Sequence, residues 1–183
     1  MFRNSITRIK KTSLLIAILI IILSAVLSYH NSFNWLYDDF SDLGLIFNLG
    51  LIISGLILLF FTKTGLSKIE NNLAVRFLMV VASISLILTG VVWNNVNHIF
   101  HLIFASLFFW SFINMQLIYG IKTIKNNKNL GILSITISLF NYIIWGGFFL
   151  WKIYNRELGF AIPELIYLIF TFIWACIFTL YYN

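Results

Sequence analysis

Six long apolar runs constrain the fold of this chain more than any other feature. They cover approximately residues 13–30, 43–61, 76–93, 98–119, 130–151 and 163–182. A helix needs about 20 apolar residues to cross the hydrocarbon core of a bilayer, because each residue adds about 1.5 Å. Six such helices use most of the 183 residues and leave only short connections. The sequence therefore predicts an all-α, polytopic integral membrane protein, a six-transmembrane-helix bundle forming a single domain over residues 1–183.

The composition excludes a soluble fold. Hydrophobic residues make up 61% of the chain and charged residues only 10%, whereas a soluble domain carries about 25% charged residues. The net charge of +6 does not require a nucleic-acid partner, because the basic residues follow the membrane topology. The one cysteine, Cys176, excludes a disulfide framework within one chain.

The first apolar run has two interpretations. Basic residues precede it, as they precede the apolar segment of a signal peptide. These are Arg3, Arg8, Lys10 and Lys11. No clean small-residue cleavage site is present, so we expect this run to be retained as the first membrane span.

The distribution of charge predicts the orientation. With a cytoplasmic N-terminus, ten basic residues lie on the cytoplasmic side and two on the other, the bias typical of membrane proteins. The ten are Arg3, Arg8, Lys10, Lys11, Lys63, Lys68, Arg76, Lys122, Lys125 and Lys128, and the other two are Lys152 and Arg156. Five of the six acidic residues lie outside, namely Asp38, Asp39, Asp42, Glu157 and Glu164. We therefore expect a multi-pass protein of the cell (plasma) membrane with both termini cytoplasmic.

Small and polar residues predict which helix faces meet inside the bundle, because close helix packing in lipid favours such residues. The faces are Ser41, Gly44, Asn48 and Gly55 in the second span; His98, His101 and Ala105 in the fourth; Gly131, Ser134, Ser138 and Asn141 in the fifth; and Glu164, Thr171, Ala175 and Thr179 in the sixth.

Polar residues also gather in the outer third of the predicted membrane. They are Asp42, Asn48, His98, His101 and Glu164. An ionisable residue at this depth marks a candidate functional site, since it is costly unless paired or hydrated. Three interpretations stay open: interfacial solvation or helix capping, a polar pocket that faces a ligand, and catalysis or a bound ion.

The spacing of His98 and His101 allows both imidazoles to point to one side of a helix. With Asp42 or Glu164 they can complete a zinc site, or they can transfer protons near neutral pH. A haem between His30 and another histidine is a further alternative. Local sequence fixes no third metal ligand and contains no GxSxG hydrolase motif. Metal, cofactor and catalytic residues (His98, His101 and Asp42 being the candidates) thus stay undetermined.

Several short motifs resemble the domain of unknown function 998 family of membrane proteins. They are Ser41-Asp42-Leu43-Gly44, then Phe47-Asn48-Leu49-Gly50-Leu51 with Gly55, and later Gly90 followed by His98 and Ala105. The proline that often precedes the first motif is replaced here by Asp39-Phe40. The resemblance covers residues from about 12 to 180 and implies a six-helix bundle without an established activity. It implies that Ser41, Asp42, Gly44, Asn48 and His98 occupy motif positions of the family. The candidate ligand-binding residues are Ser41, Asp42, Asn48, His98, His101 and Glu164.

Two hypotheses about function follow. The first is a non-enzymatic protein that binds a lipid or other amphiphile at the outer leaflet, or an accessory subunit of a membrane complex. The second is a membrane-embedded enzyme that acts on lipid headgroups, with His98 or His101 as general base and Asp42 or Glu164 orienting it. The expected partners are membrane lipids, and other membrane subunits or further copies of the chain.

Overall fold

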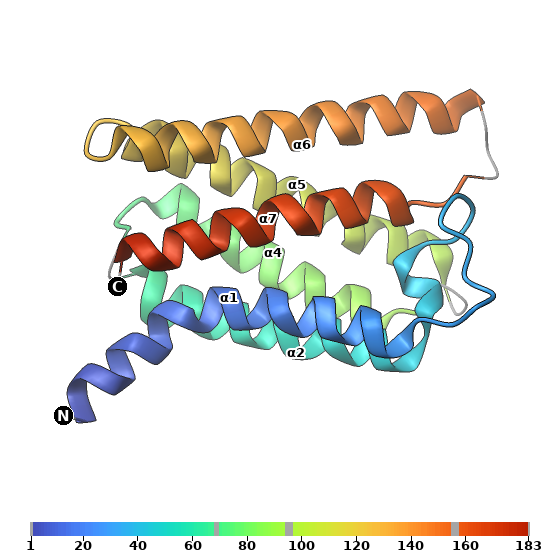
Figure 1. Ribbon diagram of the computed structural model, residues 1–183, viewed down its shortest axis with the longest axis horizontal. Helices are drawn as coiled ribbons and strands as arrows, with labels where there is room; N and C mark the ends of the chain where they lie inside the picture. The colour runs from blue at the N-terminus through green and yellow to red at the C-terminus, as the bar shows by residue number, and fades with distance from the viewer. Residues whose placement is uncertain (1, 68–69, 94–96, 155–157, 183) are drawn as a thin grey trace.

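The computed structural model describes residues 2–67, 70–93, 97–154 and 158–182, with side chains described from residue 12 onwards. Within these ranges the chain is helical and contains no strand. The elements are α1 (Phe2–Ser28), the 3-10 helix η1 (Phe40–Leu43), α2 (Leu45–Phe61), the π-helical turn η2 (Thr62–Leu66), α4 (Leu73–Val91), α5 (His98–Thr123), α6 (Lys128–Tyr154) and α7 (Ala161–Tyr182) (Figure 1).

Five helices are long and apolar enough to cross a membrane. They are α2 together with η2 (Leu45–Leu66), α4, α5, α6 and α7, and α1 adds a shorter apolar stretch, Thr12–Ser28. The prediction of an all-α, multi-pass membrane protein is confirmed. A sixth crossing by α1 stays a prediction, because its apolar stretch is shorter than those of the other helices.

Asparagine side chains fix where three of the helices begin. Asn72 accepts a hydrogen bond from Ala74 N at 3.0 Å before α4, and Asn97 accepts one from Phe100 N at 3.2 Å before α5. Asn127 accepts one from Leu130 N at 3.0 Å at the start of α6. Each satisfies a backbone N–H that has no partner inside its helix.

The helices form a closed ring. Each packs against the next in sequence, and α7 returns to pack against α1. Both termini lie at one end of the bundle (Figure 1), which we call the terminal end. The opposite end, called the loop end, carries the connection 29–44 and the described connecting residues 92–93, 97 and 158–160 (Figure 1).

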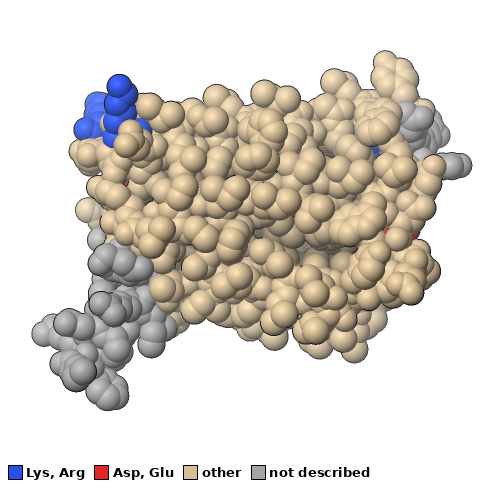
Figure 2. Space-filling view, viewed as in Figure 1, with Lys and Arg blue, Asp and Glu red and all other residues tan. Residues whose placement is uncertain are grey.

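The described basic side chains are distributed unequally between the two ends of the bundle. The described basic side chains of Lys63, Arg76, Lys122, Lys125 and Lys128 belong to segments at the terminal end, and that of Lys152 to the loop end. Figure 2 shows that a belt without charged residues separates the two ends on the face in view. The side chains of Arg3, Arg8, Lys10, Lys11, Lys68, Arg156 and Glu157 lie outside the described residues. The asymmetry agrees with a cytoplasmic terminal end, and the orientation itself stays a prediction.

Small residues let helices approach closely, as predicted. A Cβ on Gly55 of α2 would lie 2.8 Å from Ser83 O of α4, and one on Gly90 of α4 would lie 2.5 Å from Asn48 O of α2. The predicted faces of α6 and α7 are buried at Gly131, Ser134, Ser138, Asn141, Thr171, Ala175 and Thr179. Hydrogen bonds cross between helices from Ser54 Oγ to Ala17 O at 2.8 Å and from Trp174 Nε1 to Ser134 Oγ at 2.7 Å.

Candidate functional site

The connection between α1 and α2 folds across the loop end and is tied to the start of α7. Phe160 N donates a hydrogen bond to Asp39 Oδ1 at 2.6 Å, and Phe40 N donates one to Glu164 Oε2 at 2.9 Å. Gly159 N also donates to Leu36 O at 2.9 Å. A Cβ on Gly159 would collide with the backbone of Asp38. These contacts hold η1 in place over the interior of the bundle.

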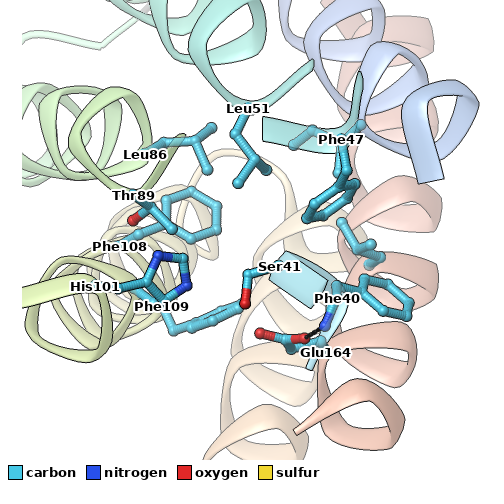
Figure 3. A pocket seen from close by; sticks show the side chains of 13 residues that line it. Phe40, Ser41, Phe47, Leu51, Leu86, Thr89, His101, Phe108, Phe109 and Glu164 are labelled. Carbon is cyan, nitrogen blue, oxygen red and sulfur yellow. Dashed lines mark hydrogen bonds between the residues drawn. The ribbon is translucent and has the colours of Figure 1, made fainter. Parts of the chain in front are cut away.

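Beneath η1 lies a small space of about 40 Å³, which we call the polar cavity. Ser41 of η1, His101 of α5 and Glu164 of α7 project into it (Figure 3). The remaining walls are mostly apolar side chains from α1, α2, α4, α5 and α7. A second space of about 20 Å³ also borders His101 and Glu164 and extends to Asp39.

Hydrogen bonds orient two of these three side chains. His101 is 6% exposed, and its Nδ1 lies 2.7 Å from Val92 O. A carbonyl only accepts, so Nδ1 carries the hydrogen, and Nε2 of the neutral ring is an acceptor. Glu164 is held through Oε2, as described above. The Ser41 hydroxyl is buried and has no hydrogen-bond partner.

The predicted site residues therefore separate into two groups. Ser41, His101 and Glu164 meet in the polar cavity. Asp42 is exposed, and its Oδ2 accepts a hydrogen bond from Asp39 N at 2.9 Å, which agrees with the capping interpretation. Asn48 is buried but does not line the cavity, and its Oδ1 has no hydrogen-bond partner.

The structure corrects the expectation that His98 and His101 share one inward face. His98 is exposed, whereas His101 is buried. Residues three apart differ by about 60° around a helix and by about 4.5 Å along its axis. His98 is the first residue of α5, so this offset places its side chain outside the packed part of the bundle.

The metal and haem hypotheses gain no support from the arrangement. Within the part of the chain that the structure describes, no group of three His, Cys, Asp or Glu side chains is placed to hold a metal ion. His30 is exposed in the α1–α2 connection, where its Nδ1 lies 2.8 Å from Ser32 Oγ.

Asp39 is a site residue that the sequence analysis counted only as an outer charge. Burial raises the pKa of its carboxyl above the ordinary value, against the opposing effect of the hydrogen bond from Phe160, and the charge of Asp42 raises the pKa further. Lys152 and His98 lower it. The sequence signal was weak, because Asp39 is one of three aspartates in residues 38–42.

This shift predicts a dependence of stability on pH. The folded protein binds the proton of Asp39 more tightly than the unfolded chain does, because the pKa of this carboxyl is higher in the fold. The resulting stabilisation is complete below pH 3.8, the ordinary pKa of the group. It is lost as pH rises through the raised pKa. Asp39→Asn keeps an acceptor for Phe160 N and removes the charge. We expect its thermal unfolding midpoint to exceed that of the wild type at neutral pH and to converge with it in acid. Asp38→Asn is the matched control, and identical pH profiles for wild type and Asp39→Asn would contradict the prediction.

A larger hollow, which we call the apolar groove, opens between α1 and α7 near the loop end. Its volume is about 400 Å³, and Figure 2 shows the surface hollowed between these helices. The lining residues are Ile22, Ala25, Val26, Tyr29, Phe33, Trp35, Phe40, Leu43, Leu165, Leu168 and Ile169. Phe40 and Leu168 line both the groove and the polar cavity, so these side chains form the wall between the two spaces.

Comparison with known protein families settles the relationship that the motifs suggested. Residues 13–181 match the family described as "Protein of unknown function (DUF998)". The chain belongs to this family. None of the curated proteins and none of the solved structures matched the chain. Membership of DUF998 assigns no activity, so a proposal about function must come from the polar cavity and the apolar groove.

Proposed function

We propose that this protein binds a membrane lipid or similar amphiphile without chemical turnover and holds its hydrocarbon chain in the apolar groove. The observation that carries the proposal is the groove itself, at about 400 Å³. Ligand pockets have volumes of about 300–1,000 Å³ and are lined mainly by apolar and aromatic side chains. The lining of this groove is entirely of these types.

The position of the groove favours a lipid as its occupant. Val26 and Ile169, on its two sides, are 67% and 48% exposed, and exposed apolar faces of membrane helices contact lipid chains. Tyr29 stacks on Trp35 with ring centroids 6.3 Å apart, and such aromatics favour the membrane–water interface. The predicted orientation would place this end in the outer leaflet of the cell membrane.

A photoreactive lipid tests the proposal. A phospholipid with a diazirine in its acyl chain is incorporated into membranes that contain the protein, and the labelled peptides are identified by mass spectrometry. We expect adducts to concentrate on the groove segments of α1 and α7. Labelling spread evenly over all lipid-facing helices, including the exposed face of α6, would contradict the proposal.

One observation favours an enzyme as the second candidate. Ser41 lies in one cavity with His101 and Glu164, and a hydroxyl, an imidazole and a carboxyl are the groups that nucleophilic catalysis combines. Of the predicted alternatives this keeps His101 with Glu164 and leaves out His98 and Asp42, since both are exposed. The enzyme hypothesis requires turnover of a lipid class by enriched membranes, with loss of turnover in His101→Gln. Unchanged lipid composition over time would exclude it.

A further inference from the structure

The polar cavity lies behind one wall of the apolar groove, and its chemistry restricts the amphiphile. We infer that the bound amphiphile carries a small hydrogen-bond-donating head, a primary amine or a hydroxyl, that enters the polar cavity while its chain occupies the groove. This inference rests on the proposed function, because the chain must first bind in the groove.

The cavity offers acceptors. The Ser41 hydroxyl is 8% exposed and lacks a partner, although buried polar groups normally have one. Glu164 uses Oε2 for Phe40 N, and its other oxygen points to the cavity side in Figure 3. With Nδ1 of His101 bonded to Val92 O, the Nε2 of the neutral ring accepts as well. A ligand that pairs with Glu164 and His101 must donate, and the Ser41 hydroxyl can accept from the same head.

The volume limits the size of the head. The polar cavity has about 40 Å³ and the adjoining space about 20 Å³, whereas a cavity of about 10–15 Å³ holds one water. An amino or hydroxyl group fits such a space. A phosphocholine group, which is several times larger, does not.

The hydrogen-bonding groups around the cavity disfavour an acidic head of the same size. Asp39 and Glu164 both border the space of about 20 Å³, and their backbone hydrogen bonds hold both carboxyls beside it. The basic side chain of Lys152 has its Nζ over the Phe160 ring, 3.7 Å from the centroid. A carboxylate head carries no donor for the acceptors in this space, which disfavours it.

The head must pass the wall formed by Phe40 and Leu168. Leu168→Ala thins this wall and leaves Ser41, His101 and Glu164 unchanged. Leu168 also lines the groove, so the readout is the affinity of a donor-headed probe relative to that of dodecylphosphocholine. We expect Leu168→Ala to keep or widen the wild-type ratio. A smaller ratio would contradict entry by this route, provided that the variant unfolds at a temperature close to that of the wild type.

Four probes with one saturated chain of nearly equal length and different heads test the inference. Dodecylamine, dodecanol, dodecanoate and dodecylphosphocholine compete against a fluorescent lipid on the full protein in nanodiscs, with empty nanodiscs as the baseline. We expect the amine or the alcohol to bind about ten-fold tighter than the other two, as a hydrogen bond of about 1.4 kcal/mol would produce. Preference for the amine alone identifies an ammonium head, and preference for both identifies the shared donor.

Ser41→Ala should reduce this preference for donor heads. Ser85 is also buried but does not line the cavity, so Ser85→Ala should leave the preference intact. Equal affinity for all four heads would overturn the inference while leaving groove binding in place. Failure of every probe to displace the fluorescent lipid, together with absence of photolabelling in the groove, would overturn both proposals.

Discussion

Gly90→Ala is expected to destabilise the bundle by about 1–3 kcal/mol, the usual cost of overpacking. The added Cβ would lie 2.5 Å from Asn48 O and 3.1 Å from Ile52 N. Both are backbone atoms, which cannot rotate away as a side chain can. The substitution therefore forces α2 and α4 apart. Gly55 of α2 makes the corresponding close approach to the backbone of α4.

Gly147→Ala provides the matched control. Gly147 lies within α6, and a Cβ there would meet no atom within 4 Å. Alanine favours helix over glycine by about 1 kcal/mol, so this variant should equal or exceed the wild type in stability. Thermal unfolding in one detergent, followed by tryptophan fluorescence, compares the two. Equal midpoints for Gly90→Ala and Gly147→Ala would show that the α2–α4 contact does not depend on Gly90.

Ala25→Trp is expected to remove most of the lipid that purifies with the protein. Ala25 is partly buried in the wall of the apolar groove, so an indole at this position occupies the space intended for the hydrocarbon chain. The polar cavity is unchanged by this substitution, because Ala25 is not among its lining residues. The bound lipid is extracted from purified protein and quantified per mole by mass spectrometry.

Leu23→Trp is the control for this experiment. Leu23 belongs to the same helix, is 57% exposed and does not line the groove. The Leu23→Trp variant introduces the same side chain on a surface that already contacts lipid. We expect Leu23→Trp to retain lipid as the wild type does. Equal retention by the two tryptophan variants would argue against the groove as the site.

The helical architecture was predictable because the bilayer imposes it. An apolar run of about 20 residues has few alternatives to a helix in lipid, and Asn97 directly before the fourth run marks the observed start of α5 at His98. The extent of α1 was less predictable. Its helix begins at Phe2, far ahead of the predicted start at residue 13, because polar residues continue a helix without an apolar signal.

The candidate site was predictable only in part. Glu164 and His101 stood out because ionisable residues at membrane depth are costly, and both border the polar cavity. Asp42 gave the same signal, although its carboxylate caps η1. The apolar groove gave no signal, because a groove residue such as Ala25 has the same sequence pattern as one that faces lipid. Its shape arises from how the α1–α2 connection folds over the seam between α1 and α7.

A native mass spectrum of the wild-type protein, extracted gently from its own membranes, tests the central claim most directly. The account predicts a chain with one additional mass in the range of a lipid or other amphiphile, absent from Ala25→Trp and retained by Leu23→Trp. A second polypeptide or a second copy alongside that mass would place the binding protein within a complex. A bare chain in the wild-type spectrum, under conditions that preserve lipid on a control membrane protein, would contradict the claim that the groove holds a lipid.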